Sequence, residues 1–140
     1  MLKRTFSYVD QHNDLRDVVA SIDAPKKIER TLDTPKELRE VGYTCAFHVT
    51  GAGLDIKGVA FGIDEFHAVL GAFRDLRFQL DALGNNIQFL GEPGYTGIPR
   101  MVTLGDRVEV QRSIEAVLDK EHRKREDELT VKQLAAAAKR

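Results

Sequence analysis

Residues 58–99 constrain the fold more than any other part of the chain, because every local signal in them agrees. Asp64 is a favoured N-cap residue at the start of a helical pattern that runs from Glu65 to about Leu83. This helix is flanked, in chain order, by an apolar run at 59–63, a Gly-Asn-Asn stop at 84–86, a second apolar run at 87–90 and a Gly/Pro loop at 91–100. The segment therefore predicts a strand, an amphipathic helix and a second strand.

Strand signals also precede this segment. Residues 5–9 and 18–22 alternate in polarity and are joined by turn residues at 10–14, which predicts a hairpin that ends near Pro25. Residues 43–50 form the clearest strand, and residues 56–63 return beside it. The expected core face of the clearest strand carries Tyr43, Cys45, Phe47 and Val49. Cys45 is therefore expected to be a buried, inert thiol.

Grouped strands followed by a helix favour an α+β fold over a repeating βαβ fold. We expect a small, mainly antiparallel sheet covered by the central amphipathic helix, with a C-terminal helical region. A short helix is also expected from Thr34 to about Val41, closed by Gly42, because Thr34-Pro35-Lys36-Glu37 resembles a capping box. Residues 1–105 are expected to form one α+β domain, and residues 106–140 a charged helical extension.

The two faces of the central helix differ in composition. Its expected core stripe consists of Phe66, Val69, Leu70, Phe73, Leu76, Leu80 and Leu83, with Ala72 at the margin. The opposite side carries His67, Gly71, Arg74 and Phe78. Either the C-terminal region covers Phe78, with Gly71 allowing close approach, or His67, Arg74 and Phe78 form a surface for a protein partner or a homodimer.

The C-terminal region begins with an expected N-cap at Asp106 and a short apolar stripe, followed by charged residues at 119–128. Opposite charges recur there at helical spacing, which indicates a solvated helix. A second capping pattern at Thr130 predicts a break near Leu129. The last segment is expected to dock on the body, to dock on a neighbouring chain, or to fray.

Composition limits the classes of partner and compartment. The chain has 140 residues, 42% of them hydrophobic, and a formal net charge of −1, so nucleic acid is an unlikely partner. A single cysteine excludes an intrachain disulfide, and no apolar run has the length of a membrane span. We expect a cytoplasmic protein that does not bind a membrane.

Chemical motifs are scarce in this sequence. It contains no Walker loop, metalloprotease motif, nucleophile elbow or dinucleotide fingerprint, so no catalytic residue, metal ligand or cofactor is predicted. Asp64 and His67 could share a metal, but N-capping by Asp64 explains the pair more simply.

The loop at 91–100 is the best candidate for small-ligand binding. Its glycines expose backbone donors, while Tyr95 and Arg100 offer stacking and charge. The alternative is a tight connection in which glycines adopt positive φ angles, and Glu92 argues against an anion.

One set of motifs resembles a known family. Residues 62–70 read Gly-Ile-Asp-Glu-Phe-His-Ala-Val-Leu, and Phe89-Leu90-Gly91 and Gly97-Ile98-Pro99 follow them. They resemble a family of small uncharacterised bacterial α+β domains with a G-[VI]-D-x-x-[QH]-A-[LV] helix start and a [WF]-L-G strand. The resemblance covers residues 3–99 and implies a bacterial or mobile-element origin and a compact α+β domain. It implies no activity.

Two functions follow as expectations. The first is a non-enzymatic binding protein, for example a toxin-neutralising immunity protein or another stoichiometric inhibitor. The second is a small-ligand-binding domain or an enzyme that uses the 91–100 loop.

Overall fold

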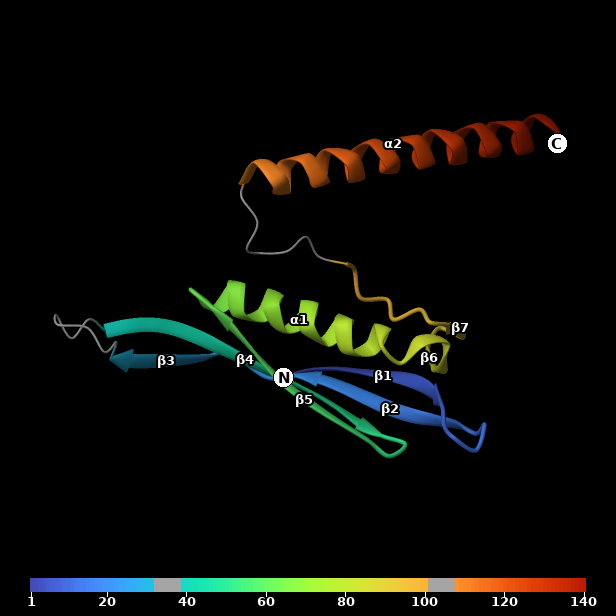
Figure 1. The fold of residues 1–140 in the computed structure, drawn as a ribbon. Coiled ribbons are helices and arrows are strands. Elements are labelled where there is room, and N and C mark those ends of the chain that lie inside the picture. The colour runs from blue at the N-terminus through green and yellow to red at the C-terminus, as the bar shows by residue number, and fades with distance from the viewer. Residues whose placement is uncertain (32–38, 101–107) are drawn as a thin grey trace. The chain divides into compact units, whose positions relative to one another are not determined.

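The computed structural model describes residues 1–31, 39–100 and 108–140. The chain divides into two units, residues 1–100 and residues 101–140. The first unit is an antiparallel sheet with the helix α1 (Glu65–Asp81) on one face, which confirms the predicted α+β fold class (Figure 1).

The sheet of the first unit is built around its longest strand, β4 (Arg39–Gly51). The other strands are β1 (Leu2–Val9), β2 (Leu15–Ile22), β3 (Lys26–Thr31), β5 (Leu54–Gly62), β6 (Ile87–Phe89) and β7 (Glu92–Pro93). β4 pairs with β2 and β3 and also with β5, while β1 lies between β2 and β6. The predicted hairpin of β1 and β2 is thereby confirmed.

The strand predicted to stop near Pro25 does stop there, but the chain then resumes as β3 beside the same neighbour, β4. Proline cannot donate to a sheet ladder, so it interrupts the pairing without redirecting the chain. The short helix predicted to reach Val41 is wrong over residues 39–41, which belong to β4. The rest of that prediction, residues 34–38, lies outside the described residues.

Helix α1 begins as predicted, because the Asp64 carboxylate accepts a hydrogen bond from the His67 backbone N–H at 2.7 Å. The predicted core stripe is partly wrong, since Phe66 is 74% exposed. The buried face consists of Ala68, Gly71, Ala72, Leu76 and Leu80. Relative to the predicted stripe, the buried face is rotated around the helix axis by almost one residue position. Its small side chains let α1 lie close to the sheet. A Cβ on Gly71 would lie 3.1 Å from Ala60 Cβ.

The core of the first unit lies between α1 and the sheet. Its fully buried side chains include Phe6, Val18, Val49, Leu80 and Ile87. Cys45 is also fully buried, and its thiol donates to the Asp23 carbonyl at 3.3 Å. The predicted burial of Cys45 is thereby confirmed, and this burial raises the pKa of the thiol.

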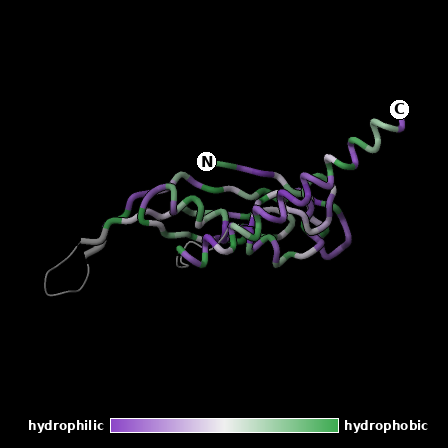
Figure 2. The backbone as a smooth tube through the Cα atoms, turned by 90° about the horizontal axis from the view of Figure 1, so that it is seen from above, coloured by the Kyte–Doolittle hydropathy of each residue, from purple (hydrophilic) through white to green (hydrophobic). Residues whose placement is uncertain are grey.

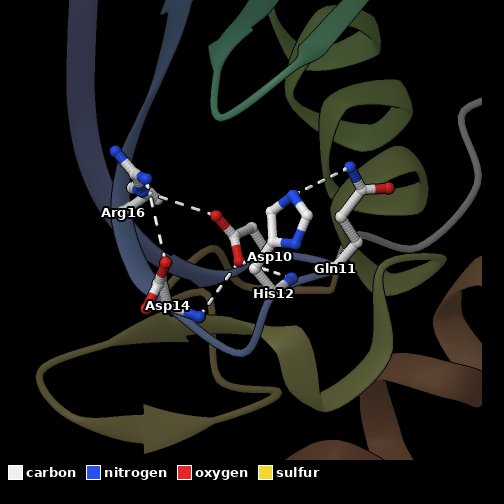
Figure 3. A network of polar contacts seen from close by, with 5 residues as sticks. All are labelled: Asp10, Gln11, His12, Asp14 and Arg16. Atoms are coloured by element: carbon white, nitrogen blue, oxygen red, sulfur yellow. Dashed lines mark hydrogen bonds and ion pairs between the residues drawn. The ribbon is translucent and has the colours of Figure 1, made fainter.

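The turn between β1 and β2 is organised by one carboxylate (Figure 3). Asp10 Oδ1 accepts the backbone N–H groups of His12 and Asp14 at 2.8 and 3.0 Å, and Arg16 pairs with Asp10 Oδ2 at 3.4 Å. These hydrogen bonds, foremost the one from Asp14, lower the pKa of Asp10. Asn13 adopts a positive φ of 63°, as residues of tight turns often do.

The second unit contains the helix α2 (Val108–Ala138), which is continuous over 31 residues. The break predicted near Leu129 is wrong. Thr130 Oγ1 donates to the Glu126 carbonyl one turn earlier at 2.9 Å, so its hydroxyl is satisfied inside the helix instead of capping a new one. Hydrophobic and hydrophilic residues are mixed along α2 (Figure 2). The expected N-cap at Asp106 lies outside the described residues.

Candidate functional site

Three large apolar side chains are exposed where β5 turns into α1. Phe61 is 69% exposed, Ile63 78% and Phe66 74%. We call this part of the molecule the β5–α1 corner. Isolated exposed apolar residues are ordinary on protein surfaces, but three within six residues of chain make this corner a candidate interface.

Gly62 sets the geometry of the β5–α1 corner. A Cβ at this position would lie 2.2 Å from the Ala68 backbone nitrogen, so only glycine lets the first turn of α1 lie so close to β5. The turn is completed by the Asp64 N-cap and by His67 Nδ1, which accepts the Ile63 backbone N–H at 3.4 Å. The exposed residues of the corner are therefore held on ordered backbone.

A concavity of about 400 Å³ lies at the β5–α1 corner. Its lining residues come from β3, β4, β5 and the start of α1, namely Ile28, Val41, Gly42, Phe61, Gly62, Ile63 and His67. Gly42 and Gly62 lack side chains, and the surrounding side chains are apolar except for His67. Such a lining suits an apolar anchor side chain with a polar group at one edge.

The three predicted partner-binding residues are distributed along α1. His67 lines the concavity, whereas Arg74 Nε pairs with Asp75 Oδ1 at 2.9 Å. Phe78 is 72% exposed and follows His67 by eleven residues, a rise of about 16 Å along the helix. Gly71, expected on the same side, is buried against Ala60 instead, so its predicted place on that outer surface is wrong.

Two arginines bind the 91–100 loop to the rest of the first unit. Arg4 donates to the Thr96 and Gly97 carbonyls at 3.3 and 3.1 Å, and its guanidinium lies 4.5 Å from the centre of the Phe89 ring. Arg77 donates to the Ile98 carbonyl. These contacts hold the loop in one conformation, with Thr96 and Ile98 buried.

A second concavity, of about 270 Å³, lies between this loop, α1 and the first strands. Gly97, Ile98 and Pro99 form its loop side. The predicted ligand-binding residues lie elsewhere. The Tyr95 ring packs 6.2 Å from the Phe89 ring, and Arg100 is exposed at the end of the described segment, so neither lines the concavity.

Titratable groups also cluster on the sheet. His48 Nε2 lies 2.6 Å from Asp55 Oδ1, and Lys57 Nζ lies 3.5 Å from the other oxygen of that carboxylate. The hydrogen bond with His48 lowers the pKa of Asp55. Within residues 1–31, 39–100 and 108–140, no three His, Cys, Asp or Glu side chains are grouped as metal ligands.

Sequence reasoning missed the β5–α1 corner because it placed Phe66 in the core. A signal was present: Phe61, Ile63 and Phe66 lie on both sides of an N-cap, where the period of the chain changes from two to 3.6. No single buried face accommodates all three side chains. The exposure of these three residues could therefore be predicted only by combining the strand period with the helix period.

No family model, curated protein or solved structure matches this chain. The family resemblance inferred from the motifs stays a prediction. Among the described helices, none combines the length and the apolar character required to cross a bilayer.

Proposed function

We propose that this protein is a stoichiometric protein-binding module, of the kind represented by immunity proteins and other inhibitors, and that its partner docks at the β5–α1 corner. The observation that supports this proposal is the exposure of Phe61, Ile63 and Phe66 at the corner, where Phe61 and Ile63 also line an apolar concavity. Aromatic residues in the centre of an interface supply much of its binding energy. His67 would contribute a polar contact at the edge.

The proposal differs from the sequence-based one in the location of the surface. Phe78 and Arg74 stay outside the β5–α1 corner, so the partner would contact the first turn of α1 instead of its middle.

The test uses three variants of matched chemistry: Phe61→Ser, Phe66→Ser and, as the control, Phe78→Ser. A partner retained by the wild-type protein from its source cell is purified, and its affinity for each variant is measured by isothermal titration calorimetry. We expect the first two variants to weaken binding by about tenfold or more, as hot-spot truncations do, with one-to-one stoichiometry. Circular dichroism melts check that every variant stays folded.

Loss of binding in Phe78→Ser alone would contradict the proposal and favour the surface of His67, Arg74 and Phe78. Unchanged binding in all three variants would place the partner elsewhere.

Small-ligand binding at the 91–100 loop is the second candidate, and the concavity beside Ile98 is the observation that favours it. Its volume lies slightly below the usual range for ligand sites, about 300–1,000 Å³. A thermal-shift screen against metabolites tests it, because a ligand present at 100 times its dissociation constant adds about 2.7 kcal/mol to the unfolding free energy. A clear shift that Gly97→Leu abolishes would support this function.

A further inference from the structure

Helix α2 carries an exposed apolar face. The helix spans 31 residues, just over four heptads, and none of them is buried. Val110, Ile114, Val117 and Leu118 form a stripe on its first turns and are all substantially exposed. A helix in water gains most of its stability by packing such a face against another surface.

The heptad pattern of α2 specifies how that face is composed. The seam positions a and d are occupied, in chain order, by Val110, Ile114, Val117, Glu121, Lys124, Glu128, Val131, Ala135 and Ala138. Both ends of the seam are therefore apolar, and its middle carries charges of both signs. Charged seam residues are costly in a helix pair unless each faces its opposite.

A parallel pair of α2 helices places each seam residue against its own copy. Glu121 would then face Glu121, Lys124 would face Lys124 and Glu128 would face Glu128. Three successive layers of like charge oppose this arrangement.

An antiparallel pair reverses the charge relation. When Ile114 is set opposite Val131 of the second copy, Glu121 falls opposite Lys124 of the second copy, and by symmetry the contact occurs twice. At the flanking g positions, Lys120 falls opposite Asp127 of the second copy, again twice. Four opposite-charge contacts therefore coincide in one register.

The apolar ends of the two helices also match in this register. Val110 meets Ala135 and Ile114 meets Val131 of the second copy, so the first part of each apolar stripe is covered by the apolar end of the other helix. Val117 meets Glu128, whose carboxylate lies one turn from Lys124 on its own helix and is compensated there. Shifting the pair by one heptad, with Ile114 opposite Ala138, keeps one pair of opposite-charge seam contacts, Lys124 with Glu128, but sets Asp127 against Asp127 and Arg125 against Arg125. The charge balance therefore favours the first of these two antiparallel registers.

We infer that α2 forms an antiparallel coiled-coil dimer with α2 of a second copy of this chain. The inference is independent of the proposed β5–α1 corner, because it rests only on residues 108–138.

Charge reversal tests the antiparallel contacts in the full-length protein. Glu121→Lys and Lys124→Glu each create like-charge layers, so each variant alone is expected to dimerise about tenfold or more weakly than the wild type in sedimentation equilibrium. An equimolar mixture of the two variants restores Lys–Glu contacts in the heterodimer and is expected to recover the wild-type affinity. Glu126→Lys, on the outer side of the helix, is the matched control and is expected to change little.

The mixture separates contacts between chains from effects within one helix. Any loss of helix stability persists in the mixture, whereas a lost charge contact between two chains is repaired. Far-ultraviolet circular dichroism of each variant records its helicity.

Disulfide trapping tests the orientation. The double variant Val110→Cys/Ala135→Cys is expected to form a covalent dimer under mild oxidation, while Val110→Cys alone is expected to stay uncrosslinked. Cys45 can be kept, because it is fully buried.

Three results would overturn the inference. One is a wild-type protein that stays monomeric at high micromolar concentration, as it would if α2 packed on its own chain. Another is a dimer that Glu121→Lys, Lys124→Glu and Glu126→Lys affect equally. The third is a disulfide formed by Val110→Cys alone, which requires a parallel pair.

Discussion

Gly62 illustrates how a missing side chain determines the position of a helix. Its hydrogen atoms allow the Ala68 backbone nitrogen to approach to a distance at which any Cβ would clash. The sequence places this glycine at the end of a predicted strand, but the close contact arises only when α1 folds back over β5.

Gly62→Ala is expected to destabilise the first unit by about 1–3 kcal/mol, because backbone atoms must move to admit the methyl group. Gly42→Ala is the control, since its Cβ would meet only the Gly62 carbonyl oxygen, at 3.3 Å. Urea denaturation followed by circular dichroism measures both free energies of unfolding. Equal losses would show that the space at Gly62 does not position α1.

Asp10 provides a test that depends on pH. Its pKa is lowered in the folded protein, first by the backbone N–H of Asp14, so its carboxylate stabilises the fold above the unfolded pKa of about 4. That contribution is lost as the pH falls through the folded pKa. We expect the melting temperature of the wild type to exceed that of Asp10→Asn at neutral pH, and the difference to shrink below about pH 4. A difference that is constant with pH would contradict this role.

Helix α1 shows which properties of an element follow from sequence and which do not. Asp64 and the polarity pattern predicted its start and approximate length. The buried face was predicted from the largest side chains. Leu76 and Leu80 of that prediction are buried, but Phe66 is not, and the small residues Ala68, Gly71 and Ala72 complete the face. Close backbone approach increases contact between two elements, and a sequence pattern that ranks residues by size does not detect it.

The rotation of α1 predicts two contrasting variants. Leu80→Ala removes a fully buried side chain and is expected to cost about 2–5 kcal/mol. Phe66→Ala removes an exposed one and is expected to change stability by no more than about 0.5 kcal/mol. Thermal melts of the two variants decide between the observed and the predicted stripe. A large loss of stability in Phe66→Ala would show that Phe66 belongs to the core after all.

At the scale of the whole molecule, the chain combines two units of different physical character. In the part of the chain that the structure describes, the fourteen buried residues of the hydrophobic core lie between Phe6 and Ile98, within the first unit. Helix α2 buries none of its residues and depends on its charge pattern and on a partner surface. Stability and assembly are therefore expected to reside in separate units.

Deleting residues 101–140 tests this separation. The remaining residues 1–100 are expected to unfold cooperatively with nearly the melting temperature of the full chain, because the core is intact. The same deletion is expected to abolish dimerisation while leaving binding at the β5–α1 corner unchanged. Calorimetry and sedimentation measure the two properties. An unfolded fragment would show that the second unit stabilises the first.

Local sequence patterns were sufficient to predict the α+β class, the β1–β2 hairpin, the Asp64 cap and the core face of β4, because each depends on neighbouring residues in the chain. Tertiary structure decided that β3 resumes beside β4 after Pro25 and that α1 presents its small residues to the sheet. It also decided that Phe66 remains exposed beside Phe61 and Ile63. These outcomes depend on how closely distant segments approach, and the alternation of polar and apolar residues along one segment carries no information about that distance.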